Sequence, residues 1–193
     1  MRHLTLACFL VFSASGAAWS STATTEVAGI RLPDRVSVAR RDLVLNGAGL
    51  RRILYTNLYV AALYLPERRR DTRDILNRDI PRSFQITLLR DVSTQQNLDV
   101  LKDGLVANNS PDEIEAIQQE VDSFLGYIKS LWEVTAGTVI QLNYLPGIGT
   151  RVSVNDRFLG TIQGEAFNRV MLRIWLGNDP AEGSLKRALL GSI

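Results

Sequence analysis

The sequence predicts an α+β fold in which an antiparallel sheet carries a helical layer packed on one face. Three observations predict it. Apolar residues recur with a period of two in two separate blocks, helical spacing follows each block, and strands and helices never alternate as βαβ units. The order is therefore strands, helices, strands, helices, which favours an antiparallel sheet with the helices segregated to one side.

The first 20 residues have the three-part layout of a secretory signal peptide. Arg2 and His3 give a positive start, residues 4–12 are apolar, and small residues follow, so that cleavage after Ala18 or after Ser20 fits equally well. The apolar run is too short to cross a bilayer, which needs about 20 residues. Cys8 raises the alternative of a lipoprotein signal, but the residues before it make a poor lipobox. We expect an exported, periplasmic protein without a membrane span in its mature chain.

Cleavage would remove the only cysteine, Cys8, and the only histidine, His3. About 170 residues would remain, enough for one domain with its own core; we place a tail at 21–28 and the domain at 29–193. Without thiol or imidazole, the mature chain excludes catalytic triads, cysteine nucleophiles and ordinary zinc sites. We therefore expect no metal and no cofactor. We also expect no nucleic-acid partner, because the net charge of +2 falls to +1 when Arg2 is lost.

The first block predicts short strands at 36–39 and 43–45. Asn46 to Gly49 then predicts a turn, because Asn and Gly tolerate positive φ. Residues 53–65 are aromatic and β-branched, and their second half is apolar on both parities, which predicts a central strand covered on both faces. The basic segment 67–74 is interleaved with acids, which favours a solvated loop over an anion-binding patch.

The first helical block follows. Asp71 caps a short helix over 71–78, a strand is expected at 82–89, and residues 93–108 show the spacing of a helix with one buried stripe. Ser110, Pro111 and Glu113 form a capping box, which predicts the start of a helix that runs to Trp132.

The second block predicts a β-meander with strands at 139–144, 151–154 and 158–162, joined by turns at 146–149 and 155–156. A helix over 165–176 stopped by Gly177 and a last helix over 180–190 complete the chain.

Polar side chains lie among the apolar ones of the expected central strand. Tyr55, Asn57 and Tyr59 share one parity, and Arg51 stands just before them. A strand face that is polar at one end can line a cleft with a wet mouth, where Arg51 and Tyr59 would make a good clamp for a carboxylate. From spacing alone, the simpler interpretation of a core tyrosine beside a surface arginine is favoured.

Several segments, taken in order, resemble the chalcone isomerase-like family, and within it the exported bacterial branch. They are NGAGLR at 46–51, YVAALYL at 59–65, LRDV at 89–92 followed by Gln95–Gln96, YLPG at 144–147, and Phe167–Asn168 leading to IWLG at 174–177. Together they span nearly the whole mature chain. The resemblance implies the chalcone isomerase-like fold, in which the sheet and the helices enclose an apolar cleft.

The plant isomerases of that family use a strand arginine, a threonine on the central strand, and a helix that carries tyrosine, lysine and asparagine. By resemblance the arginine corresponds to Arg51 and the threonine to Tyr59. The helix tyrosine, lysine and asparagine correspond to Asn97, Val100 and Gly104. A serine or threonine from a later helix corresponds to Asn168. Only the arginine is retained, so the resemblance implies no catalytic residues and argues against chalcone isomerase activity.

The non-catalytic fatty-acid-binding members of the family keep the arginine and place a tyrosine where the isomerases have threonine, as Arg51 and Tyr59 do here. The resemblance therefore implies a carrier or sensor of a small apolar acid such as a fatty acid. The ligand-binding candidates are Arg51, Tyr59, Asn97 and Asn168. Two alternatives remain open: an isomerase or lyase of unknown substrate in which Arg51 stabilises an anion, and an interaction module whose cleft is only a core.

Overall fold

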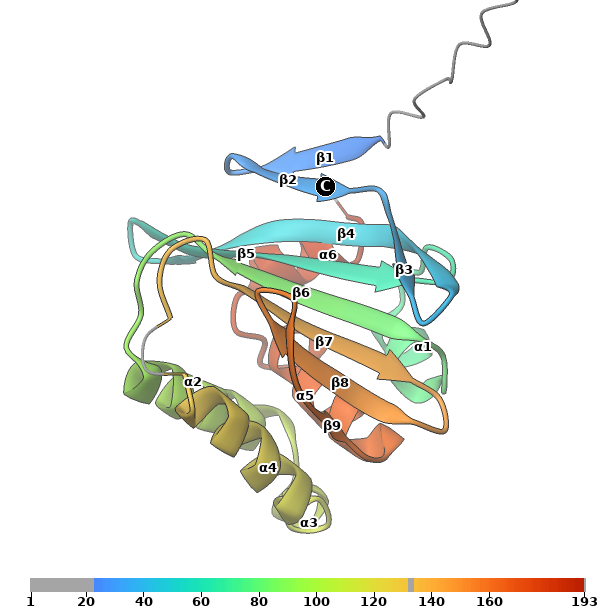
Figure 1. Ribbon diagram of the computed structural model, residues 1–193, viewed down its shortest axis with the longest axis vertical. Coiled ribbons are helices and arrows are strands. Elements are labelled where there is room, and N and C mark those ends of the chain that lie inside the picture. Colours follow the sequence, from blue (N-terminus) through green and yellow to red (C-terminus); the bar gives the residue numbers. More distant parts are fainter. Residues whose placement is uncertain (1–22, 132–133, 193) are drawn as a thin grey trace, which may run out of the picture.

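A computed structural model describes residues 23–131 and 134–192 and shows a curved seven-stranded sheet with helices on its inner face (Figure 1). Every strand is antiparallel to its neighbours, and the strands lie side by side in chain order. They are β3 (Arg35–Val38), β4 (Arg41–Ile53), β5 (Thr56–Leu65), β6 (Arg82–Leu88), β7 (Val139–Leu145), β8 (Gly149–Val154) and β9 (Arg157–Ile162). The predicted fold class is confirmed, and the predicted signal peptide lies outside the described residues.

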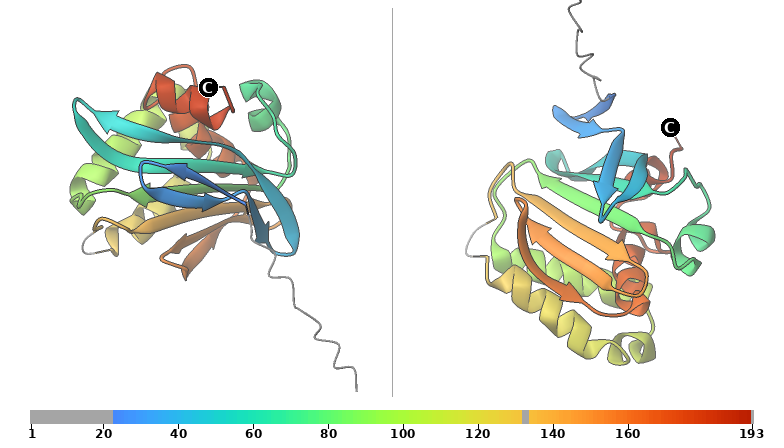
Figure 2. Two further views of the ribbon diagram at one scale, coloured as in Figure 1. Left: turned by 90° about the horizontal axis from the view of Figure 1, so that it is seen from above. Right: turned by 45° about the vertical axis from the view of Figure 1, so that its right-hand side comes forward.

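A separate hairpin covers the outer face of the sheet at β4 and β5. It consists of β1 (Thr24–Val27) and β2 (Ile30–Pro33), and it lies on the opposite side of these strands from the last helix (Figure 2). Leu32 of this hairpin joins a second core with Leu43, Leu45, Val60, Ala62 and Tyr64. The sequence of residues 21–33 is polar and predicts an irregular segment, which is wrong for both strands. Because the residues of β1 are largely exposed, their sequence has no apolar alternation that would reveal a strand.

The central hairpin turns later than the sequence predicts. β4 continues to Ile53, so the turn expected at 46–49 is wrong, and β5 starts at Thr56 after a turn at Leu54 and Tyr55. The glycines serve a close helix contact instead, because a Cβ at Gly47 would lie 2.0 Å from the carbonyl oxygen of Ala188. A β-bulge between Leu45 and Gly47 accompanies this contact.

Six helices complete the described chain. They are α1 (Thr72–Asn77), α2 (Thr94–Asn108), α3 (Pro111–Glu115), α4 (Gln118–Lys129), α5 (Glu165–Leu176) and α6 (Gly183–Leu189). The predicted caps are confirmed: Asp71 accepts a hydrogen bond from the Asp74 amide, and Ser110 forms the capping box with Glu113.

The single helix predicted from Ser110 to Trp132 is wrong, because the chain breaks between α3 and α4. The backbone at Ile117 has a φ of −127°, which no helix adopts. Ile117 is buried, as are Val121, Phe124 and Ile128 of α4, so the break directs one apolar stripe of α4 into the core. Trp132 lies outside the described residues.

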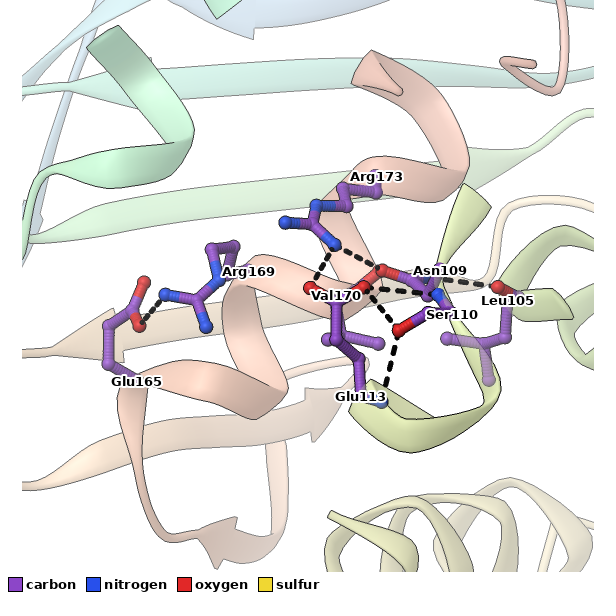
Figure 3. Close-up of polar contacts among 8 residues, drawn as sticks. All are labelled: Leu105, Asn109, Ser110, Glu113, Glu165, Arg169, Val170 and Arg173. Carbon is purple, nitrogen blue, oxygen red and sulfur yellow. Dashed lines mark hydrogen bonds and ion pairs between the residues drawn. The ribbon is translucent and has the colours of Figure 1, made fainter. Parts of the chain in front are cut away.

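The helical layer is anchored on α5, whose apolar residues form much of the main core. Polar contacts hold the corner between α2 and α3 against it (Figure 3): Arg173 donates to Asn109 Oδ1 at 3.0 Å and to Glu113 Oε1 at 2.8 Å, and Asn109 Nδ2 donates to the carbonyl of Leu105 at 2.9 Å. These contacts fix α2 above the inner face of the sheet.

The last helix closes the other end of this face. Asn46 Nδ2 donates to the carbonyl oxygen of Leu189 at 2.7 Å, and Asn46 Oδ1 accepts the amide of Arg69 at 2.6 Å. One buried side chain of β4 thereby holds both the C-terminal helix α6 and the loop that leads into α1.

Candidate functional site

A cavity of about 820 Å³ lies between the inner face of β4–β7 and the helices α2, α4 and α5. This volume is in the range of ligand pockets, about 300–1,000 Å³. Its walls are mostly apolar, with Ile86, Leu88, Ile140 and Leu142 from the sheet and Leu101, Phe124, Ile128, Ile174 and Trp175 from the helices. A few polar side chains interrupt these walls, and Arg51 and Tyr59 are among them.

Arg51 and Tyr59 are direct cross-strand partners in the ladder between β4 and β5. Their side chains share the inner face, because residues opposite each other in a ladder project to the same side. The Nε and Nη1 atoms of Arg51 are buried and have no hydrogen-bond partner among the described residues. Buried polar atoms without a partner cost free energy, and they are rare in native proteins.

The phenol of Tyr59 is held from the helical side. Trp175 Nε1 on α5 donates a hydrogen bond to the Tyr59 hydroxyl oxygen at 2.7 Å, and the indole packs against Phe84 with ring centroids 4.4 Å apart. Burial raises the pKa of Tyr59, although the nearby Arg51 charge and the Trp175 hydrogen bond act in the lowering direction. The phenol therefore keeps its proton at neutral pH, and because its oxygen already accepts from Trp175, that proton is oriented away from the indole.

The aligned positions of α2 lie beside the same cavity. Val100 and Gly104 line it, and Gly104 packs closely on α5, since a Cβ there would lie 2.9 Å from Ile174 Cγ2. Asn97 belongs to α2, but its side chain lies outside the described residues. Asn168 is buried on α5 with an unpartnered Oδ1 and does not line the cavity. The structure therefore brings Arg51 and Tyr59 together and leaves Asn168 apart.

The polar mouth expected from Tyr55 and Asn57 does not form, because both side chains are exposed and neither lines the cavity. The cause is a β-bulge between Arg51 and Arg52, which changes the register of the two strands just before the turn. Thr56, Arg90, Asp91, Gln96, Asp103 and Asp179 contribute polar groups to the lining instead.

Trp175, Arg90 and Gln96 were not singled out as site residues from the sequence. Each lies in or beside a segment on which the family resemblance is based. That resemblance is the one sequence signal near these three residues. Nothing in the local spacing of α5 distinguishes Trp175 from the other apolar residues of the same helix.

The chemical groups along the cavity are limited. Its lining contains arginine, tyrosine, carboxylates, threonine and glutamine, with no lysine among the lining residues of the described chain. Within the described residues, no group of three or more histidine, cysteine, aspartate or glutamate side chains could hold a metal ion. None of the helices described is long and apolar enough to span a membrane.

Two comparisons with known proteins bear on this architecture. A model of the family described as chalcone isomerase-like matches residues 24–191. Among solved structures, the fold is similar to the crystal structure of a fatty-acid binding protein from Arabidopsis thaliana, with a TM-score of 0.66 and 14% sequence identity over 84% of this chain and 92% of that chain. A search of curated proteins found no match.

Proposed function

Because this chain belongs to the chalcone isomerase-like family, we propose that it is a non-catalytic protein that binds a small apolar carboxylate, such as a fatty acid, in the cavity between sheet and helices. The observation that carries this proposal is the guanidinium of Arg51, whose buried Nε and Nη1 atoms have no hydrogen-bond partner among the described residues, beside the phenol of Tyr59 in a mostly apolar cavity. A carboxylate with an apolar tail complements both parts of this site.

A comparison within the molecule supports an anionic ligand at Arg51. Arg82 is fully buried, whereas Arg51 is half-buried, and Arg82 donates to the carbonyl of Ile75 at 2.6 Å and pairs with Glu165 at 3.5 Å. No ion pair among the described residues includes Arg51. The buried Nε and Nη1 atoms of Arg51 lack partners, and a bound carboxylate would supply a counter-charge through charge-assisted hydrogen bonds of about 1.5–3 kcal/mol.

The Tyr59 phenol would give the second contact. Its oxygen accepts from Trp175, so its proton is available to a carboxylate oxygen held by Arg51. Burial raises the pKa of Tyr59, which keeps this donor neutral throughout the physiological range. The two residues would thus offer one charged and one neutral donor to the same ligand group.

The lining favours binding over isomerisation. Val100 and Gly104 stand where the resemblance places a lysine and an asparagine in the plant isomerases, and neither side chain can transfer a proton. General acid–base catalysis needs a group that does so within reach of the substrate. The fold similarity to a fatty-acid binding protein supports the same choice of ligand class.

We also propose that the protein acts outside the cytoplasm. The support is the N-terminal sequence, with its positive start, short apolar run and small residues at Ala18 and Ser20. Peptide mass analysis of protein recovered from its native compartment should find a mature N-terminus between residues 19 and 24, and an intact Met1 would contradict this.

The test of binding compares an acid with its neutral ester. Delipidated protein is titrated with palmitate and with methyl palmitate while the intrinsic tryptophan fluorescence, to which Trp175 at the cavity contributes, is followed. Palmitate should bind with micromolar or lower Kd, and the ester should bind at least tenfold more weakly because it lacks the charge that Arg51 would pair. Equal affinities, or no binding of either compound, would overturn the proposal.

A further inference from the structure

The exposed apolar side chains of the described residues are concentrated at the rim of the cavity. In the part of the chain that the structure describes, seven large apolar side chains are exposed, and three of them are consecutive: Ile53 at 46%, Leu54 at 89% and Tyr55 at 102%. We call these three residues the turn tip. Ile53 and Leu54 also line the cavity, as does the exposed Val100 of α2. The apolar interior thus continues onto the outer surface at this point.

The backbone of the turn tip is strained. Leu54 has a φ of +54°, a left-handed conformation that is unfavourable for residues with a Cβ and is tolerated best by Gly, Asn and Asp. The turn between β8 and β9 shows the ordinary solution, with Asn155 and Asp156 at positive φ. Ala28, Ala39 and Arg40 have positive φ in two other hairpin turns, so the distinguishing feature of the turn tip is that a leucine at such a position is almost fully exposed and contributes nothing to the core.

Cationic side chains flank the turn tip. Arg52 is its neighbour on β4, Arg90 lines the cavity after β6, and both residues are exposed. Two nearby carboxylates accept hydrogen bonds from backbone amides: Glu182 from the Arg52 amide at 2.6 Å, and Asp91 from the Ala136 amide at 2.8 Å. No ion pair among the described residues includes Arg52 or Arg90, so both guanidinium groups are available to phosphate.

We propose that the turn tip, with Val100, docks on a phospholipid membrane and that the apolar ligand enters and leaves the cavity there. The inference rests on the proposed function, because a fatty acid partitions into bilayers. Leu54 would insert among the acyl chains, Tyr55 would lie at the headgroup level that tyrosine prefers, and Arg52 and Arg90 would meet the lipid phosphates. In Figure 1 the β4–β5 turn extends from the same end of the sheet as the loops that follow β6 and precede β7, which leaves this end accessible to a flat surface.

The experiment measures co-sedimentation of the purified protein with vesicles of phosphatidylethanolamine and phosphatidylglycerol. Tyr55→Glu is the test variant, because Tyr55 does not line the cavity. Phe158→Glu is the matched control, since Phe158 is an exposed aromatic residue on β9 with 52% of its surface accessible. Tyr55→Glu should weaken vesicle binding at least tenfold, whereas Phe158→Glu should change it less than twofold.

A second measurement follows transfer of a fluorescent fatty acid from the protein to the same vesicles. If the membrane is contacted directly, the transfer rate of the wild type rises with vesicle concentration and that of Tyr55→Glu does not. The affinity of Tyr55→Glu for the fatty acid without vesicles should stay within twofold of the wild type.

The outcomes separate the two proposals. A protein that binds the fatty acid tightly but does not sediment with vesicles would overturn the docking site and leave the proposed function standing. Vesicle binding that persists in protein unable to bind any fatty acid would overturn the proposed function. A third result would also overturn the inference: the wild type is a dimer that does not bind vesicles, and Tyr55→Glu is a monomer. The turn tip would then contact a second copy of the chain.

Discussion

The indole of Trp175 donates a hydrogen bond of 2.7 Å to the phenol oxygen of Tyr59, joining residues 116 positions apart in the chain. This contact connects the helical layer with the central strand at the wall of the cavity. It fixes the orientation of the one neutral donor that accompanies Arg51, and it places a fluorescent group next to the site where a ligand carboxylate would bind.

Replacing the phenol should weaken ligand binding modestly. Tyr59→Phe keeps the ring but removes a neutral donor, so palmitate should bind about 0.5–1.5 kcal/mol more weakly. Tyr64→Phe is the matched control, because Tyr64 is a fully buried tyrosine on the same strand whose hydroxyl belongs to the outer-face core. Titration calorimetry of both variants tests this, and an equal loss in Tyr64→Phe would show that only packing had changed.

Replacing the cation should have a larger effect. Arg51→Ala should weaken palmitate binding by about 1.5–3 kcal/mol, which is about tenfold to 150-fold. The neutral methyl ester should bind the variant almost as well as palmitate does, since the contact that distinguishes them is gone. Arg52→Ala, which removes the same charge from the neighbouring exposed position, should leave solution affinity unchanged. If it costs as much as Arg51→Ala, the effect is not a specific contact.

The ion pair between Glu113 and Arg173 should make stability depend on pH. The Arg173 hydrogen bond, together with the Ser110 amide, lowers the pKa of Glu113 from 4.5 to about 2. A lowered folded-state pKa stabilises the fold above about pH 4.5, and this stabilisation is lost as the pH falls toward 2. Because Glu113 is 39% exposed, the contribution should be about 1 kcal/mol or less.

Denaturant unfolding between pH 7 and pH 2 tests this expectation. Glu113→Gln should be less stable than the wild type at pH 7, and the difference should shrink as the pH falls below 4.5. Glu115→Gln, on the same helix and without an ion pair among the described residues, should show no such convergence. A difference between wild type and Glu113→Gln that stays constant over this range would contradict the assignment.

The strain at Leu54 predicts a substitution that stabilises the fold. Leu54→Asn should raise the free energy of unfolding by about 1 kcal/mol, because asparagine tolerates the left-handed conformation and Leu54 buries almost no surface. Tyr55→Asn should give no gain, since Tyr55 does not have positive φ. Urea unfolding measures both variants. If the docking proposal holds, Leu54→Asn should also bind vesicles less well, so that stability and docking change in opposite directions.

The close approach of α6 to β4 predicts an intolerant glycine. In Gly47→Ala the added methyl group would overlap the carbonyl oxygen of Ala188, a backbone atom that cannot move freely, and the fold should lose about 3 kcal/mol or more. Gly126→Ala is the control, because no atom outside the backbone of its own helix turn lies within 4 Å of a Cβ at that position. It should be neutral or stabilising by up to about 1 kcal/mol. Thermal unfolding that ranks the two variants the other way would show that the contact is misplaced.

Local signals were sufficient for much of the fold. The caps at Asp71 and Ser110 and the period-two strands of the second block depend on neighbours within a few residues, and the structure has them where the sequence predicts them. The turn of the central hairpin was misplaced because glycine has two physical uses. At Gly47 it permits close packing, while the real turn contains Leu54, which carries no turn signal.

The site was harder to predict because it depends on register and on distant contacts. The pairing of Arg51 with Tyr59 requires the bulges of the β4–β5 ladder, which no local pattern in the sequence reveals. The family resemblance identified both residues, but it did not indicate Trp175 as the partner of the phenol. The break at Ile117 was missed for a similar reason, since helical spacing continues on both sides of it.

The contact between Asn46 and Leu189 sets an order on the folding of this protein. The two residues are 143 positions apart, so a ribosome must deliver almost the entire chain after β4 before α6 can cover the glycines of that strand. Until then a nascent chain has strands whose inner face at this end is bare. Contacts that span so much chain carry a high closure entropy and slow the folding reaction. Completion of the native sheet with its helical cover is therefore expected only after α6 has been synthesised.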